Sequence, residues 1–132
     1  MRFTARELDI MSVLWEHGPS TIAEVRSRLA DEVSHNTVAT MLGILEEKGY
    51  VAHTREGRAF RFQSLVTRQV AATSALSRIV DTIFSGSAEA LLSHFARDRR
   101  LTREELKRIR GIIDQRVERD KRQQSSRAGR KS

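Results

Sequence analysis

The sequence contains no cysteine among its 132 residues, which excludes a disulfide framework, a thiolate zinc site and a thiol redox switch. It also has no apolar run of the roughly 18–20 residues that a membrane-spanning helix needs. The opening residues Met1-Arg2-Phe3-Thr4 lack the apolar stretch of a secretory signal peptide. From these absences we expect a soluble, cytoplasmic protein that is not inserted into a membrane.

Residue patterns typical of catalysis or metal binding are missing as well. The histidines lie at positions 17, 35, 53 and 94, so no two of them have the three- or four-residue spacing that places metal ligands on one helical face. The sequence has neither a G-x-S-x-G turn for a serine nucleophile nor a G-x-x-x-x-G-K-[ST] loop for phosphates. We therefore expect no enzymatic activity, no metal and no other cofactor.

The positive charge is unevenly distributed along the chain. Residues 1–66 carry 8 basic and 9 acidic side chains, residues 67–118 carry 10 and 7, and residues 119–132 carry 6 and 1. The net charge of +7 therefore lies mostly in the last segment, which has almost nothing to bury and is typical of a disordered tail. Such a tail either adds sequence-independent attraction to phosphates or is only a solvated end, and both interpretations stay open.

Helix-start signals and a change of period organise residues 1–66. Thr4 and Thr21 each precede a glutamate by three residues, which is the spacing of a capping box. Ser34 can cap a third helix, whose apolar stripe is Val38, Met41, Leu42 and Leu45. Residues 50–54 and 59–63 then alternate with a period of two around a glycine-containing turn, which predicts a β-hairpin. Three helices followed by a hairpin is the order of a winged helix-turn-helix, with the hairpin as the wing.

A recognition helix enters the major groove of DNA with its N-terminal residues toward the bases. The candidates for DNA contact are therefore the positions of the third helix outside its apolar stripe: His35, Asn36, Thr37, Ala39, Thr40 and Gly43. Asn36 can form the paired hydrogen bonds that favour adenine, and the threonine and alanine methyl groups can meet a thymine methyl. On the hairpin, we expect three arginines to hold phosphates or to reach a minor groove: Arg55, Arg58 and Arg61. The alternative is that Asn36 and Thr37 only cap the helix and that the arginines only solubilise the hairpin.

Residues 67–118 contain three further helical patterns, each with an apolar stripe. The apolar residues expected to support self-association are Leu76, Ile79, Val80, Ile83, Phe84, Leu91, Leu92, Phe95, Leu106, Ile109 and Ile113. Three short helices bury little apolar surface on their own, because domains of this size are marginally stable. We therefore expect this region to pack against a second copy of the chain. The alternative is an intramolecular bundle that needs no partner.

Several segments resemble the penicillinase-repressor (BlaI/MecI/CopY) family of winged-helix transcriptional regulators. They are residues 8–18 (LDIMSVLWEHG), 36–42 (NTVATML), 48–51 (KGYV), 57–62 (GRAFRF), 84–87 (FSGS) and 101–106 (LTREEL). The resemblance implies a homodimeric repressor of transcription, in which the winged helix binds a half-site and the C-terminal helices interlock two chains. Because a two-fold dimer places two such modules on DNA, we expect a palindromic operator in double-stranded DNA.

The resemblance also implies a route by which repression ends. In the best-known members, a membrane sensor-protease signals the presence of a β-lactam antibiotic, and the repressor is then cut in its dimerisation region. The position that matches this cut is the bond between His94 and Phe95, with histidine where those repressors have asparagine. The copper-responsive members sense metal through C-terminal cysteines, which this chain lacks.

The predicted fold is mainly α with a small β-hairpin wing. Residues 1–66 form the winged helix-turn-helix DNA-binding domain, residues 67–118 the three-helix dimerisation domain, and residues 119–132 a basic tail. The predicted function is that of a dimeric transcriptional repressor. The alternative function is a protein-interaction module that uses the winged helix without binding specific DNA.

Overall fold

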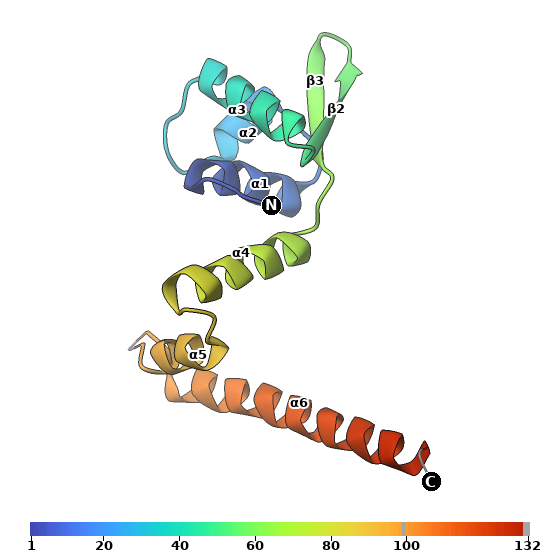
Figure 1. The fold of residues 1–132 in the computed structure, drawn as a ribbon. Coiled ribbons are helices and arrows are strands. Elements are labelled where there is room, and N and C mark those ends of the chain that lie inside the picture. Colours follow the sequence, from blue (N-terminus) through green and yellow to red (C-terminus); the bar gives the residue numbers. More distant parts are fainter. Residues whose placement is uncertain (99, 131–132) are drawn as a thin grey trace. The chain divides into compact units, whose positions relative to one another are not determined.

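The computed structural model describes residues 1–98 and 100–130 of the chain. These residues form six helices and three strands (Figure 1): α1 (Ala5–His17), β1 (Ser20–Thr21), α2 (Ile22–Arg28), α3 (His35–Glu47), β2 (Val51–Glu56), β3 (Ala59–Ser64), α4 (Arg68–Ile83), α5 (Ala88–Ala96) and α6 (Arg103–Arg130). The chain divides into two compact units, residues 1–82 and residues 83–132. None of the helices that the described residues form has both the length and the apolar character that crossing a membrane requires.

The first two helices begin at the predicted capping boxes. The Thr4 hydroxyl accepts a hydrogen bond from the Glu7 N–H at 3.1 Å, and the Glu7 carboxylate accepts one from the Thr4 N–H at 2.7 Å. The same reciprocal pair links Thr21 and Glu24 at the start of α2. Each box satisfies two backbone donors that a helix start otherwise leaves without a partner.

A small antiparallel sheet follows the third helix. Its strand order is β1-β3-β2, and the hairpin pairs from Val51 opposite Ser64 to Glu56 opposite Ala59. Gly57 in the turn has φ +63°, a left-handed conformation that glycine adopts without steric cost. The sequence predicted the hairpin but not β1, whose two residues pair with Phe62 and Arg61. This short strand pairs with the middle of β3 and leads directly into α2.

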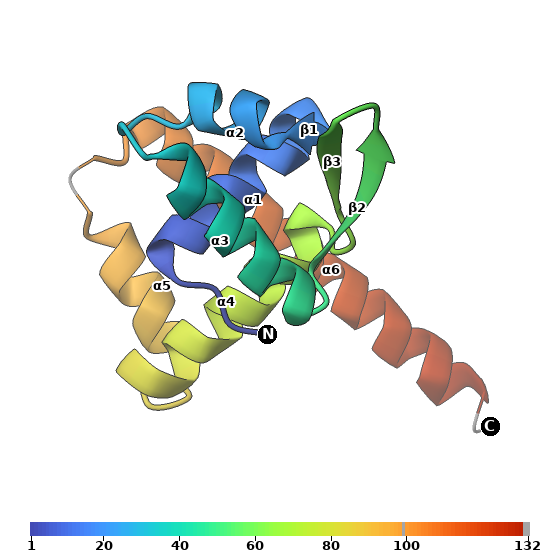
Figure 2. The ribbon, with the colours of Figure 1, turned by 90° about the horizontal axis from the view of Figure 1, so that it is seen from above.

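The core of the first unit lies between its helices and the sheet. It consists of Ile10, Met11, Val13, Leu14, Val25, Val38, Leu42, Leu45, Val51 and Phe62. In both ribbon views the first three helices are grouped beside the hairpin, whose turn projects beyond them (Figures 1 and 2). The mainly helical unit with its antiparallel wing confirms the predicted winged-helix fold.

Most of α4 lies in the first compact unit, which ends at residue 82, whereas the sequence predicts a domain boundary at residue 66. Trp15 at the end of α1 donates a hydrogen bond from Nε1 to the Val66 carbonyl at 2.9 Å, just before α4 begins. The guanidinium group of Arg68 lies 5.9 Å from the centre of the Trp15 ring, and Ala71 is buried. These contacts attach the start of α4 to the winged helix.

The second unit consists of α5, α6 and the segments beside them. We expected residues 119–132 to be disordered, but α6 continues as a helix to Arg130, and residues 131–132 of this tail lie outside the described part. Extending an existing helix avoids the cost of nucleation. Ion pairs spaced four and three residues apart also support it, namely Arg116 with Asp120 at 3.0 Å and Lys121 with Glu118 at 3.6 Å.

Candidate nucleic-acid interface

One face of α3 gathers several of the residues predicted to meet DNA. Asn36, Thr40 and Gly43 are spaced by four and three residues, which places them on the same side of the helix, and all three are exposed. The opposite side carries the fully buried Val38, Leu42 and Leu45. Within the described residues, the Asn36 side chain has no hydrogen-bond partner. Its amide is therefore free to pair with a ligand.

Ser34, rather than Asn36, closes the start of α3. The Ser34 hydroxyl accepts a hydrogen bond from the Thr37 N–H at 3.1 Å and lies 2.8 Å from the Thr37 hydroxyl. Ser34 is therefore the N-cap, and within the described residues neither the Asn36 nor the Thr37 side chain accepts a hydrogen bond from a backbone N–H of α3. His35 is exposed on the first turn of α3, whereas Ala39 is half-buried.

Sequence reasoning missed one apolar residue on the exposed side of α3. Ile44 follows Gly43, and 42% of its surface is exposed. It lies seven residues beyond Thr37, about two helical turns away on the same side. Its apolar side chain suits contact with a thymine methyl group. The sequence does show that Ile44, a large aliphatic residue directly before Leu45, is not part of the apolar stripe, and this is the signal that could have identified it.

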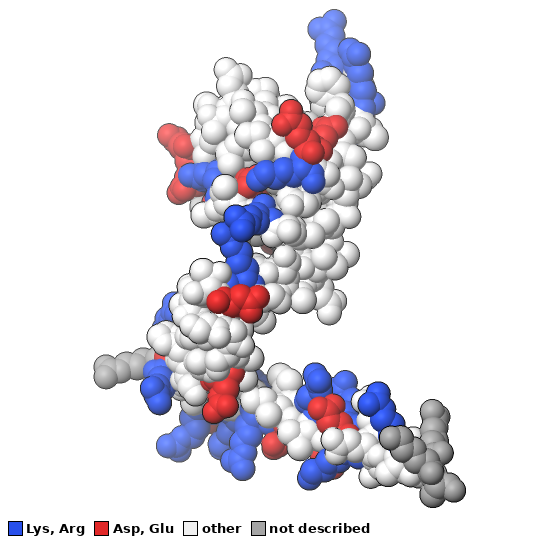
Figure 3. All heavy atoms as spheres, in the orientation of Figure 1, with Lys and Arg blue, Asp and Glu red and all other residues white. Residues whose placement is uncertain are grey.

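The three arginines predicted on the wing have different surroundings. Arg58 in the turn is exposed and has no hydrogen-bond or ion-pair partner among the residues that the structure describes. Arg55 donates from Nε to the Gly57 carbonyl at 3.3 Å, which holds it against the turn. Figure 3 shows basic side chains at the tip of the hairpin and acidic side chains gathered beneath it.

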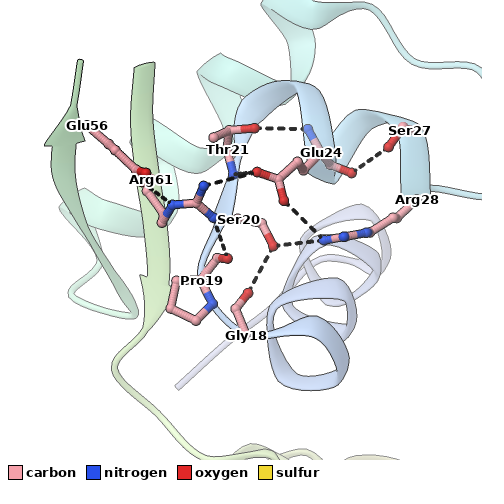
Figure 4. A network of polar contacts seen from close by, with 9 residues as sticks. All are labelled: Gly18, Pro19, Ser20, Thr21, Glu24, Ser27, Arg28, Glu56 and Arg61. Atoms are coloured by element: carbon pink, nitrogen blue, oxygen red, sulfur yellow. Dashed lines mark hydrogen bonds and ion pairs between the residues drawn. The ribbon is translucent and has the colours of Figure 1, made fainter. Parts of the chain in front are cut away.

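Arg61, the third predicted wing contact, is engaged with carboxylates (Figure 4). Its Nε donates to Glu56 of β2, and its Nη1 donates to the Pro19 carbonyl at 3.0 Å. Its Nη2 lies 3.4 Å from Oε1 of Glu24 at the start of α2. The hydrogen bond with Glu56, aided by both negative charges, raises the pKa of Arg61. The hydrogen bond with Thr21, followed by the charges of Arg61 and Arg28, lowers the pKa of Glu24.

The other face of the hairpin is connected to α3. His53 of β2 pairs with Phe62, while the next residue, Thr54, pairs with Arg61. Because neighbouring residues of a strand point to opposite faces, the His53 and Arg61 side chains lie on opposite faces. His53 Nδ1 lies 2.7 Å from the Glu46 carboxylate, and its ring is 5.0 Å from the Phe60 ring. The hairpin therefore contacts α3 through His53 on one face and α2 through Arg61 on the other.

The residues predicted to support dimerisation leave much apolar surface exposed. Those exposed in the single chain are Leu76, Ile79, Ile83, Leu92, Phe95, Leu106 and Ile113. The others, Val80, Phe84, Leu91 and Ile109, are half-buried. In the second unit, Leu92 and Phe95 of α5 line an open groove together with residues of α6: Leu106, Ile109 and Ile113. Ile112 of α6, which lies outside the predicted set, is 66% exposed.

The residues matching the family's cleavage position lie in the last turn of α5. The His94 ring is 5.9 Å from the Phe84 ring, and Phe95 is exposed. In residues 1–98 and 100–130, no group of three or more His, Cys, Asp or Glu side chains is placed to hold a metal ion.

Comparisons with known proteins agree with this architecture. The family model described as penicillinase repressor matches residues 3–115. The penicillinase repressor of Bacillus licheniformis is 26% identical over 117 residues, covering 87% of this chain and 91% of that protein. The methicillin resistance regulatory protein MecI of Staphylococcus aureus (strain N315) is 19% identical over 115 residues, covering 84% of this chain and 92% of that protein.

Solved structures support the fold. The structure of the hsRosR complex superposes with a TM-score of 0.54 at 21% identity, covering 87% of this chain and 90% of that chain. At this identity the likeness establishes the fold only. The family match extends over most of the chain, which confirms the resemblance noted in the sequence. The chain belongs to the penicillinase repressor family, whose members are DNA-binding transcriptional repressors and not enzymes.

Proposed function

We propose that this protein represses transcription in the cytoplasm as a homodimer that binds a palindromic operator. The observation that carries the proposal is the exposed face of α3 formed by Asn36, Thr40 and Gly43, on which the Asn36 side chain has no hydrogen-bond partner among the described residues. Asparagine is suited to pair with the edge of adenine in the major groove, and that pairing gives sequence preference. Arg58 at the tip of the wing supplies a charge suited to a phosphate.

The homodimer is supported by the apolar surface that a single chain leaves in water. Ile83 is 69% exposed and Leu76 is 51% exposed, and large exposed apolar surfaces mark sites of association. The groove between α5 and α6 is lined by further apolar side chains. A second copy of the chain supplies apolar helix faces of the same kind, because a two-fold interface is self-complementary. Such a dimer presents two α3 helices to two half-sites.

For the end of repression, we propose proteolysis at the bond between His94 and Phe95 by a membrane sensor-protease. The bond lies within α5, so the last turn of this helix has to open before a protease can cut it. Phe95 is exposed even in the helix, and its removal from the groove would weaken the dimer. Incubation with membranes that contain the protease, followed by mass spectrometry of the fragments, tests this step. An intact chain after induction contradicts it.

The test of the main proposal is the binding of labelled duplexes at several salt concentrations. For each phosphate that the protein neutralises, the slope of log K against log salt steepens by about 0.9. A repressor gives a steep slope and prefers a palindromic duplex, selected from a random pool, over a shuffled duplex. The alternative, a protein-interaction module, gives neither the slope nor the preference. Sedimentation of the same samples reports whether the bound species contains two chains.

A further inference from the structure

Arg61 joins three parts of the winged helix through one guanidinium group. It reaches Glu56 on β2, Glu24 at the start of α2 and the Pro19 carbonyl in the segment before β1. The planar guanidinium can bridge several acceptors at fixed angles, which the point charge of a lysine cannot do. Figure 4 shows these acceptors arranged around Arg61. A phosphate would have to compete with all of them.

The two carboxylates lie on elements that face DNA in the proposed complex. In helix-turn-helix proteins the first helix of the motif crosses the DNA backbone, and Glu24 lies in the first turn of the corresponding helix α2. Glu56 is next to the turn of the wing, two residues before Arg58. An uncompensated carboxylate at either position would repel phosphates, and Arg61 offsets part of this negative charge at both positions.

The network continues from Glu24 into the first unit. Oε2 of Glu24 lies 3.6 Å from Nη1 of Arg28, and the same nitrogen donates to the Ser20 hydroxyl at 3.3 Å. Ser20 is fully buried and donates to the Gly18 carbonyl at 2.9 Å. Through Glu24, Arg28 and Ser20, Arg61 is thus linked to the Gly18 carbonyl, at the C-terminal end of α1. On the opposite face of the hairpin, His53 contacts Glu46 of α3.

We propose that Arg61 is a positioning residue, which fixes the wing to α2 and offsets part of the negative charge of Glu24 and Glu56, and that it does not itself hold a phosphate. This inference rests on the proposed binding of DNA by α3 and the wing. Its consequence is that the wing meets DNA with a fixed backbone geometry, so that only the side chain of Arg58, and not the hairpin, has to be ordered on binding. Without the bridge, part of the binding free energy is spent on ordering the hairpin.

Charge-conserving variants separate positioning from phosphate contact. Arg61→Lys keeps the charge but loses the bridge, so we expect it to weaken binding to a selected duplex by about tenfold. The matched control is Arg116→Lys, which keeps the charge of an exposed arginine that pairs with Asp120 at 3.0 Å in α6, outside the winged helix, and we expect an effect within about twofold. If Arg61 held a phosphate as a simple charge, both lysine variants would bind within about twofold of the wild type.

A second pair of variants separates the two roles of Arg61, because positioning and simple charge predict changes of opposite sign in DNA affinity. Glu56→Gln removes a negative charge, so electrostatics alone predicts tighter binding to DNA. We expect weaker binding instead, because the charged acceptor of the Arg61 Nε–H hydrogen bond is replaced by a neutral amide, which weakens the bridge. The matched control is Glu47→Gln, an exposed glutamate at the end of α3, which should leave binding unchanged or tighten it.

The measurements are anisotropy titrations of the full chain with a duplex that the wild type selects from a random pool, accompanied by thermal melting. Exposed ion pairs contribute little to stability, so the melting curves of the variants should match that of the wild type. If Glu56→Gln alone melts early, Glu24→Gln replaces it, since glutamine also completes a capping box. If Arg61→Lys binds nearly as well as the wild type and the glutamine variant binds more tightly, the inference about Arg61 is wrong, while the proposed function still stands. A wild type that binds no duplex overturns the proposed function and this inference with it.

Discussion

Replacing Lys48 with methionine tests how α3 is held in place against α1. Lys48 directly follows α3, and its Nζ contacts Oε1 and Oε2 of Glu7 at 3.1 and 2.9 Å. Only 3% of the Glu7 side chain is exposed, against 38% for Lys48. The pair therefore connects the end of α3 to the first turn of α1. In the Lys48→Met variant the buried carboxylate keeps its hydrogen bond from the Thr4 N–H but loses its cation.

The size of the effect follows from the burial of the two groups. A hydrogen bond to a charged group contributes about 1.5–3 kcal/mol, and removing one partner of a fully buried ion pair costs about 3–5 kcal/mol. Because water reaches Lys48, we expect the lower range and a loss of about 2 kcal/mol in the free energy of unfolding. In a domain of this size that loss lowers Tm by about 10 °C.

Urea and thermal unfolding, followed by circular dichroism at a fixed protein concentration, measure this loss. The Glu7→Gln variant and the double variant complete a double-mutant cycle, in which we expect a coupling energy of about 1–2 kcal/mol. Glutamine at position 7 can still complete the capping box with Thr4. A loss below about 0.5 kcal/mol for Lys48→Met, or additive single effects, would refute the reasoning.

Three further predictions follow from the same structure. Burial raises the pKa of Glu7, but hydrogen bonds from Lys48 and Thr4 outweigh it and hold the pKa below the ordinary value of 4.5. The ionised Glu7 therefore stabilises the fold above pH 4.5, and this stabilisation is lost as the pH falls through the lowered pKa. The Glu7→Gln variant should not show this loss of stability in an acid titration. A Cβ added at Gly43 meets nothing within 4 Å, so Gly43→Ala should stabilise α3 by about 0.5–1 kcal/mol, and weaker operator binding by the more stable variant would show close approach of DNA to this position. Ile83→Glu places a charge on an exposed apolar stripe and should convert the dimer into monomers in sedimentation without lowering the Tm of the winged helix, whereas a variant that sediments as the wild type does contradicts the interface.

Local signals predicted most of the winged helix. The capping boxes at Thr4 and Thr21 involve residues only three positions apart, so the sequence shows them directly. The hairpin has six residues in each strand, enough for a period of two to be recognised. β1 has two residues, which is too short to show any period, and its pairing depends on the position of β3.

Partners distant in sequence account for the features that were missed. The alternation of β3 indicates which side Arg61 occupies but not that Glu24, 37 positions earlier, lies on the same side. The attachment of α4 to the first unit depends on Trp15, which is 51 positions from Val66. The helical end of α6 has low apolar content, which is typical of disordered segments, so composition alone does not predict it; the helix forms because it continues from the preceding turns.

The most direct test of the central claim compares Asn36→Ala with Arg58→Ala on a selected palindromic duplex and on a shuffled duplex. If α3 reads the bases, Asn36→Ala reduces the preference for the palindrome by about 1–3 kcal/mol. If the wing holds a phosphate, Arg58→Ala weakens both complexes equally and lowers the salt slope by about one unit. The reverse pattern, in which Arg58→Ala removes the preference and Asn36→Ala weakens both duplexes equally, would contradict the account and make the wing the reader of the sequence.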